Sequence, residues 1–116
     1  TGASTDTTEE SAEEILNKRL KALISSSEVM LFMKGNPTAP RCGFSRQAVE
    51  LLTSANIAFG TFDILSDEDV RQGLKKYSDW PTYPQLYVNG ELIGGCDIVL
   101  ELHENGELQE IIDQAK

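Results

Sequence analysis

The sequence contains few basic residues and no long hydrophobic run. Its longest uninterrupted apolar stretch is the five residues from Val29 to Met33, whereas a helix that crosses a bilayer needs about 20. We therefore expect no membrane-spanning segment and no membrane partner. Ten Lys and Arg stand against 19 Asp and Glu, which gives a formal net charge of −9. Because nucleic-acid binding depends on clustered basic residues that neutralise phosphates, we expect no nucleic-acid partner.

Cysteine is also scarce. Cys42 and Cys96 are the two present, too few for the disulfide framework that stabilises small secreted domains, so a reducing compartment is favoured. At 116 residues and 40% hydrophobic, the chain suits one compact domain with a single modest core. The first residue is Thr1 rather than Met, and we expect the sequence to be a piece of a longer protein.

Residues 1–10 have no large apolar side chain and consist of Thr, Ser, Gly, Ala and acidic residues. Such a segment cannot compensate for the entropy lost on ordering. We therefore predict that residues 1–10 are a disordered linker and that the folded domain covers 11–116.

The first half of the domain predicts a helix, a strand and a second helix. Ser11 and Glu14 form a capping-box pattern ahead of apolar residues at helical spacing, which predicts a helix over about 11–26. The continuous apolar run 29–33 is typical of a central strand buried on both faces. A loop is expected over 35–41, and helical periodicity after it places Cys42 at or just before a helix N-terminus.

The second half predicts a strand over 59–64, which completes a βαβ unit and so pairs in parallel with the first strand. Ser66 is the predicted N-cap of the next helix. Residues 85–93 predict a hairpin, because Asn-Gly at their centre suits a type I′ turn. Asp97 is predicted to cap a helix that reaches Leu102, and a short helix follows. Together these elements predict an α/β fold with a four-stranded mixed sheet flanked by helices.

Cys42 has surroundings that suit a reactive thiol. A thiolate, rather than a thiol, attacks disulfides and binds metals. A helix N-terminus offers unpaired N–H groups and the positive end of the helix dipole, and Lys34, Arg41 and Arg46 lie close in sequence. Gly43 has no side chain to obstruct a bulky partner. The alternative interpretation is that Cys42 is a small, buried and inert side chain.

The fourth position of the run Cys42-Gly43-Phe44-Ser45 is a serine, where a dithiol redox enzyme has a second cysteine. A disulfide within the motif is therefore not available. Cys96 is either a resolving thiol, which requires its Cα to come within about 5.5–6 Å of that of Cys42, or a small residue that packs beneath the Gly-Gly turn before it. We favour the second interpretation.

The sequence contains five motifs: Lys34, Cys42-Gly43-Phe44-Ser45, Arg71-Gln72-Gly73-Leu74, Trp80-Pro81-Thr82-Tyr83-Pro84 and Gly94-Gly95-Cys96-Asp97-Ile98. In this order and at this spacing they resemble the motifs of the monothiol CGFS-type glutaredoxins, and the resemblance runs from about Val29 to the end of the chain. The chain is most similar to the glutaredoxin modules of multidomain cytosolic and nuclear proteins, which follow a thioredoxin-like domain through a linker, so that residues 1–10 would be a remnant of that linker. The resemblance implies the thioredoxin fold.

The resemblance also implies a glutathione site. In it, Lys34 and Arg71 meet the glycine carboxylate of glutathione, and the backbone of Tyr83, which precedes a cis-Pro84, pairs with the cysteinyl backbone. The backbone of Cys96 and the carboxylate of Asp97 hold the γ-glutamyl end. These roles agree with the chemistry of glutathione, whose two carboxylates and one ammonium need cations and an anion in the site.

Each of these residues also has a simpler interpretation when the family is set aside. Lys34 and Arg71 are then solvated charges, and Asp97 is only a helix cap. Pro84 is then an ordinary trans proline, because only about 5–6% of X–Pro bonds are cis.

Counting ligands limits how the chain could hold a metal cluster. A [2Fe–2S] cluster usually takes four thiolates, and only Cys42 is well placed here, so one chain cannot complete the set. The resemblance implies that two chains, each with its Cys42, share the cluster with two glutathione thiolates. A zinc site is disfavoured, because Cys42, Cys96 and His103 supply neither the ligand number nor the spacing. His103 is expected to face solvent.

The residues and the resemblance together leave three candidate functions. The first is glutathione-dependent binding and transfer of [2Fe–2S] clusters, or reporting of iron status, with a homodimer when the cluster is bound and a BolA-like protein as an alternative partner. The second is glutathione-dependent thiol–disulfide exchange by a one-thiol route, with slow turnover. The third is an adaptor domain whose acidic C-terminal region binds partners. The resemblance to cytosolic and nuclear proteins leads us to expect a cytoplasmic location, with the nucleus as a second one.

Overall fold

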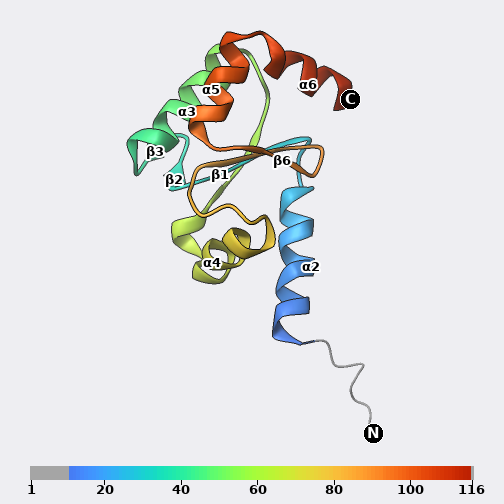
Figure 1. The fold of residues 1–116 in the computed structure, drawn as a ribbon. Helices are drawn as coiled ribbons and strands as arrows, with labels where there is room; N and C mark the ends of the chain where they lie inside the picture. The colour runs from blue at the N-terminus through green and yellow to red at the C-terminus, as the bar shows by residue number, and fades with distance from the viewer. Residues whose placement is uncertain (1–10, 116) are drawn as a thin grey trace, which may run out of the picture.

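The computed structural model describes residues 11–115, and the disorder predicted for residues 1–10 falls outside them. The described chain forms five α-helices, a four-stranded sheet and a separate two-stranded sheet (Figure 1). In chain order the elements are α2 (Ala12–Ile24), β1 (Val29–Met33), β2 (Gly35–Asn36), β3 (Ala39–Pro40), α3 (Gly43–Ser54), β4 (Gly60–Asp63), the 3-10 turn η1 (Ile64–Ser66), α4 (Glu68–Tyr77), β5 (Gln85–Val88), β6 (Glu91–Gly94), α5 (Cys96–Glu104) and α6 (Glu107–Ala115).

The four-stranded sheet is mixed, as predicted, with the strand order β4-β1-β5-β6. Strand β1 pairs in parallel with β4, with Leu31 opposite Thr61, and antiparallel with β5, with Leu31 opposite Leu86. The β5–β6 hairpin turns at Asn89 and Gly90, whose φ angles of 51° and 84° are those that an Asn-Gly type I′ turn requires. The predicted βαβ unit and hairpin are therefore both confirmed.

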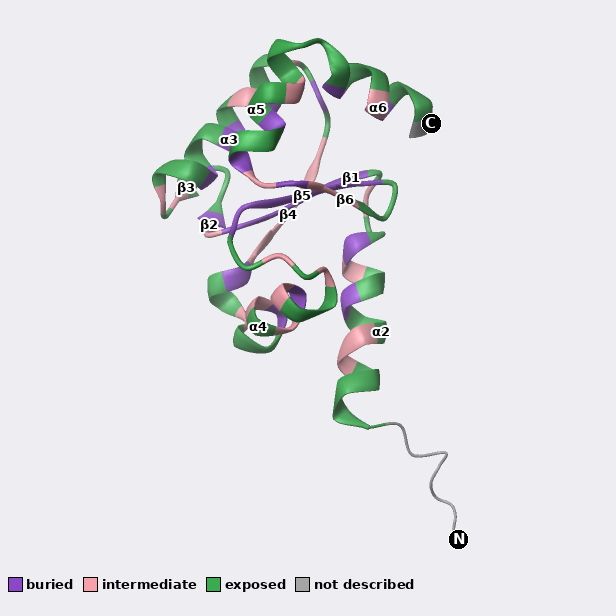
Figure 2. Ribbon diagram, in the orientation of Figure 1, coloured by how far each residue is buried: buried purple, intermediate pink, exposed green. Residues whose placement is uncertain are grey.

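Strand β1 is buried on both faces, and its side chains divide the core into two halves. Val29, Leu31 and Met33 pack among residues of α3, α5 and α6, whereas Met30 and Phe32 pack among residues of α2 and α4. Successive side chains of a strand point to opposite faces, so a strand between two helical layers must be apolar throughout. Figure 1 shows these helix layers on either side of the sheet, and Figure 2 shows that burial is concentrated along the sheet and on the helix faces turned toward it.

Helix α2 begins where the capping box predicts. The Glu14 backbone N–H donates to Ser11 Oγ at 3.1 Å, and the Ser11 backbone N–H donates to Glu14 Oε1 at 3.0 Å. Helix α2 packs against α4 at Gly73, where a Cβ atom would lie only 2.9 Å from Leu16 and 3.1 Å from Leu20. The absence of a side chain at Gly73 thus allows the close approach of the two helices, and α4 carries one of the predicted site residues.

Two local predictions need correction. The loop 35–41 contains the short strands β2 and β3, which a sequence pattern cannot indicate because each has only two residues. The N-cap of α4 is Asp67 rather than Ser66, since an Asp67 carboxylate oxygen accepts from the Val70 backbone N–H at 3.2 Å. The Ser66 hydroxyl instead donates to the carbonyl of Asp63 at 2.6 Å.

Within residues 11–115, no helix has the length and apolar character needed to cross a membrane.

Candidate functional site

Cys42 is the N-cap residue of α3. Its backbone is extended, with φ −153° and ψ 156°, and its Sγ accepts from the Ser45 backbone N–H at 3.3 Å. An N-cap side chain normally supplies an oxygen to this N–H. Here a sulfur takes that place, so the N–H groups of the first turn and the helix dipole act directly on the thiol. The predicted position of Cys42 at a helix N-terminus is confirmed, and its side chain is half-buried rather than enclosed.

Ser45 contacts the thiol with its side chain as well as its backbone. Its hydroxyl is fully buried, lies 3.3 Å from Cys42 Sγ and accepts a hydrogen bond from the Lys34 backbone N–H at 3.1 Å. Because a thiolate can only accept, the hydroxyl hydrogen of Ser45 must point toward Cys42 when that residue is ionised. Ser45 therefore has a chemical role of its own and does more than stand in place of a second cysteine.

The segment that carries Lys34 is fixed by backbone contacts. The Gly35 N–H donates to Asp63 Oδ1 at 2.9 Å, and the Arg41 N–H donates to the Lys34 carbonyl at 2.8 Å. Gly35 has a φ of 90°, and a Cβ atom there would lie 2.5 Å from the Ala39 carbonyl oxygen, so only glycine fits. These contacts hold Lys34 at the end of β1, beside the start of α3.

The balance of these effects lowers the pKa of Cys42. Burial raises the pKa of the thiol, but the Ser45 hydroxyl, the backbone N–H groups of Ser45 and Phe44 and the charge of Lys34 together outweigh burial. The pKa therefore lies below that of an ordinary cysteine. The interpretation of Cys42 as an inert buried side chain is not consistent with this geometry.

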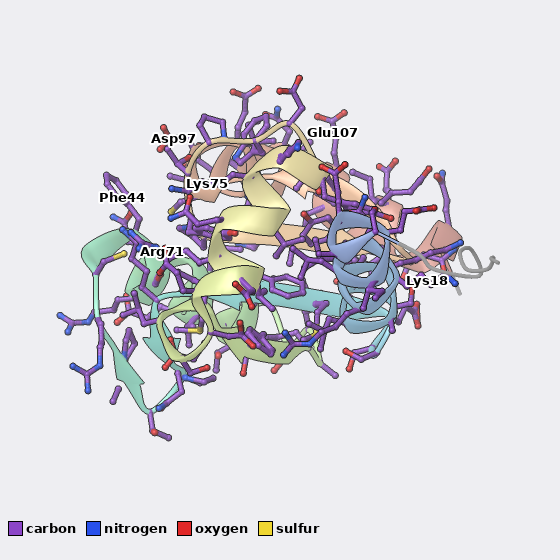
Figure 3. The ribbon with its side chains drawn as sticks, turned by 90° about the horizontal axis from the view of Figure 1, so that it is seen from below. Lys18, Phe44, Arg71, Lys75, Asp97 and Glu107 are labelled. Atoms are coloured by element: carbon purple, nitrogen blue, oxygen red, sulfur yellow. The ribbon has the colours of Figure 1, made fainter. Side chains whose placement is uncertain are left out.

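Next to Cys42, a cleft of about 470 Å³ brings together all six of the other predicted site residues. They come from the end of β1, from α4, from the loop before β5 and from the start of α5: Lys34, Arg71, Tyr83, Pro84, Cys96 and Asp97. Cys42 is not itself a lining residue, but its neighbour Phe44 is, and so is Lys34, whose charge acts on its thiol. Figure 3 shows Phe44, Arg71, Lys75 and Asp97 on the same side of the molecule, away from Lys18 and Glu107.

The cleft also contains residues that sequence reasoning missed. Lys75 lies one helical turn after Arg71 on α4 and adds a third cation to the lining. The sequence signal that could have identified Lys75 is its position four residues after Arg71, because residues at this spacing share a helix face. Phe44 and Ile98 line the cleft with 60% and 38% of their surfaces exposed, and Trp80 lines it from the loop before β5.

Two buried N–H groups that border the cleft have no hydrogen-bond partner among the described residues, Arg71 Nε and Trp80 Nε1. Buried donors are usually paired, so each is available to an acceptor on a bound molecule or to water.

The Arg71 guanidinium forms an ion pair, from Nη1 to Glu68 Oε1 at 3.2 Å. Its backbone carbonyl accepts from the Tyr83 hydroxyl at 2.7 Å, which ties α4 to the loop before β5. The peptide bond between Tyr83 and Pro84 is cis, as the family resemblance implies.

The start of α5 corrects the prediction for Asp97. The N-cap of α5 is Gly95 and there is no side-chain cap, so the exposed Asp97 is a first-turn residue rather than the cap. Cys96, the first residue of the helix, is 8% exposed, and its Sγ lies 3.4 Å from Gln47 Oε1. Burial raises the pKa of Cys96, and the negative charges of Asp97 and Cys42 raise it further by smaller amounts. Both cysteines are free, and Cys96 is buried.

Metal-ligating side chains do not converge in the part of the chain that the structure describes. No group of three or more His, Cys, Asp and Glu residues within 11–115 could hold a metal ion. His103 is exposed on α5, as predicted. The donor chemistry near the cleft fits one thiolate ligand per chain, from Cys42, with the remaining ligands supplied from outside the chain.

Comparison with known proteins identifies close relatives. The family model described as Glutaredoxin matches residues 29–93. Monothiol glutaredoxin-S11 of Oryza sativa is 66% identical over 89% of this chain, and Glutaredoxin 3 of Danio rerio is 65% identical over 84% of it. The solution structure of reduced poplar apo GrxS14 is 50% identical, with a TM-score of 0.75, and the match covers 86% of this chain and 92% of that one. The chain spans 21% of the length of the Oryza protein and 30% of that of the Danio protein.

Proposed function

The chain belongs to the glutaredoxin family, and within it to the monothiol branch, and from this premise we propose that it binds glutathione and carries [2Fe–2S] clusters on Cys42. The observation that carries the proposal is the setting of one thiol. Cys42 is accessible, has a lowered pKa and lies beside a cleft lined by cations and a carboxylate. The chain spans only part of the length of these relatives. For the activity and partners of the whole protein, we propose the same functions.

The lining of the cleft suits glutathione, the tripeptide that this family uses. Lys34, Arg71 and Lys75 provide positive charge for the glycine carboxylate, with Arg71 Nε as an additional unpaired donor. Asp97 provides a negative charge for the γ-glutamyl ammonium. The backbone of Tyr83, on the loop between these charges, pairs with the cysteinyl backbone. This arrangement directs the glutathione sulfur toward Cys42.

The number of ligands requires two chains to bind one cluster. Each chain supplies one thiolate, from Cys42, and each bound glutathione supplies another, so two chains with two glutathione molecules reach the four thiolates that a [2Fe–2S] cluster takes. The chains bind the cluster and transfer it to a recipient protein, so that the cluster is a transported substrate. The half-exposed position of Cys42 at the edge of the cleft allows a second chain, or a BolA-like protein, to approach the same thiol.

A second candidate function is thiol–disulfide exchange, which the lowered pKa of Cys42 favours. The Cys42 thiolate would attack the glutathione sulfur of a protein–glutathione mixed disulfide, and the protein would leave as a thiolate. A second glutathione thiolate would then attack the glutathione sulfur bound to Cys42, which releases glutathione disulfide and restores the Cys42 thiolate. Ser45 cannot resolve the intermediate, so turnover depends on free glutathione and is expected to be slow.

Anaerobic reconstitution with iron, sulfide and glutathione tests the leading proposal. We expect visible absorption from a bound cluster together with a dimer on size-exclusion chromatography, both dependent on glutathione. Cys42→Ser should abolish both, whereas the matched control Cys96→Ser should retain them. A colourless monomer under these conditions would contradict cluster binding. Rapid turnover with a glutathione mixed disulfide, lost in Cys42→Ser, would instead favour the exchange reaction.

The family relationship is also the basis of a proposal about the compartment. We propose a cytoplasmic location, with the nucleus as a second one, in which reduced glutathione keeps both cysteines free. Fractionation of cells that express the full-length protein, followed by immunoblotting, measures this distribution.

A further inference from the structure

A series of hydrogen-bonded polar side chains, buried at Gln85 and Tyr87, lies behind the loop that carries Tyr83. Gln85, at the start of β5, is fully buried, and its Nε2 donates to the carbonyls of Trp80 and Thr82 at 3.2 and 3.3 Å. Its Oε1 accepts from the Tyr87 hydroxyl at 2.6 Å, and Tyr87 is only 1% exposed. The Tyr87 hydroxyl in turn lies 2.6 Å from the hydroxyl of Ser78.

The hydrogen bonds of this chain run in one direction. The single hydroxyl hydrogen of Tyr87 points to Gln85 Oε1, so the bond between Ser78 and Tyr87 must be donated by Ser78. Both hydrogens of the Gln85 amide then point to carbonyls of the loop. Rotating the amide by 180° would place its oxygen against two carbonyl oxygens, which is unfavourable. The network thus specifies one orientation for Gln85.

The chain of hydrogen bonds joins two walls of the cleft. Ser78 is the C-cap residue of α4, the helix that carries Arg71 and Lys75, and Gln85 holds the loop of residues 80–84 at two carbonyls. The Tyr83 hydroxyl adds a second tie between the two walls through the Arg71 carbonyl. In Figure 2 this loop is the segment that connects α4 to β5. The position of this loop relative to α4 therefore depends in part on Gln85, Tyr87 and Ser78, none of which lines the cleft.

We propose that Gln85 is a positioning residue for glutathione, which holds the 80–84 loop so that the Tyr83 backbone and the α4 cations meet one ligand at the same time. This inference rests on the proposed glutathione site. The role of Gln85 is indirect, because it contacts the loop rather than the ligand. Buried polar networks that are fully satisfied specify one arrangement of the groups they join.

Gln85→Met removes the amide and keeps a side chain of similar length. We expect about tenfold weaker binding of glutathione by calorimetry, because only a fraction of molecules would then hold the loop in its binding conformation. The pH profile of Cys42 alkylation should not change, since Gln85 does not contact the thiol. Ile112→Val is the matched control, because it removes a buried methyl group from α6 and lowers stability without touching the loop.

The chain also contains a probe of the loop that needs no ligand. Trp80 is the single tryptophan and belongs to the loop itself. Gln85→Met should increase the quenching of its fluorescence by acrylamide in the glutathione-free protein, whereas Ile112→Val should leave it unchanged. Tyr87→Phe, which breaks the connection to Ser78 but keeps both loop bonds of Gln85, should give a smaller change of the same sign. Tyr77→Phe, the same chemical change at a 41%-exposed tyrosine, is its control.

The outcomes separate this inference from the proposed function. Weaker binding and greater quenching in Gln85→Met, beyond the effect of Ile112→Val, support the positioning role. Effects no larger than those of the control overturn it. If the wild-type protein itself fails to bind glutathione, the proposed function is wrong and the quenching of Trp80 alone decides whether Gln85 positions the loop. If Gln85→Met does not fold, the comparison of Tyr87→Phe with Tyr77→Phe decides it.

Discussion

The N-termini of α3 and α5 can be compared directly, because each has a cysteine at or next to its N-cap position. The pKa of Cys42, at α3, is lowered, and the pKa of Cys96, at α5, is raised. Burial raises the pKa at both sites. At Cys42 the Ser45 hydroxyl, two backbone N–H groups and Lys34 outweigh burial. At Cys96 the neighbouring charge is the carboxylate of Asp97, and the polar partner is the Gln47 oxygen, which can only accept.

This comparison shows that a helix N-terminus is not sufficient to activate a thiol. The α5 terminus has its own dipole, yet its cysteine is held in the protonated form by burial and by negative charge. What distinguishes Cys42 is a set of hydrogen-bond donors that point at its sulfur. Three labelling experiments test this distinction, with expected effects that decrease from Cys42 to Ser45 to Asp97.

The largest effect should come from removing the Cys42 thiol. At neutral pH we expect iodoacetamide to modify Cys42 rapidly and Cys96 slowly, because the reaction requires the thiolate and access to it. Cys42→Ser should therefore remove the fast phase, and Cys96→Ser should leave it intact. Mass spectrometry of the labelled protein over time measures both phases. Equal rates at the two cysteines would contradict the proposed difference between the helix termini.

Ser45→Ala should reduce the difference between the two thiols. Without the hydroxyl donor the pKa of Cys42 rises, so its alkylation profile moves to higher pH. A hydrogen bond to a charged group contributes about 1.5–3 kcal/mol, so below the pKa we expect the alkylation rate of Cys42 to fall by about tenfold or more. In the wild type, reactivity is lost as the pH falls through the lowered pKa, and in the variant it is lost at a higher pH. Ser54→Ala, at an exposed serine of the same helix, is the control and should leave the profile unchanged.

The smallest effect is expected at α5. In a Cys42→Ser background, Asp97→Asn removes a negative charge that raises the pKa of Cys96, so the alkylation profile of Cys96 should move to lower pH. The shift should be modest, because burial is the larger cause and is unchanged. Glu101→Gln makes the same change of charge further along α5 and should have no effect. A profile that moves equally in both variants would mean that overall charge, rather than the contact with Asp97, governs Cys96.

The sequence predicted the elements whose signals are local. The apolar run 29–33 indicated a strand buried on both faces, the Ser11–Glu14 pair indicated a capping box, and Asn89-Gly90 indicated the hairpin turn, and all three are confirmed. It was less reliable where neighbouring residues compete for one role. Asp67 caps α4 in place of Ser66, and Gly95 rather than Asp97 precedes α5 as its N-cap.

The sequence by itself determined the chemistry at Cys42. A lone cysteine before an amphipathic helix, with serine in the fourth position of its motif, already excluded a disulfide within that motif and required outside thiols for any cluster. Only the tertiary structure decided which hydrogen-bond donors meet the Cys42 sulfur and that Lys75 shares the cleft beside it. The reason is physical: burial, and contacts such as that between the Lys34 N–H and Ser45 Oγ, depend on segments that meet only in the fold.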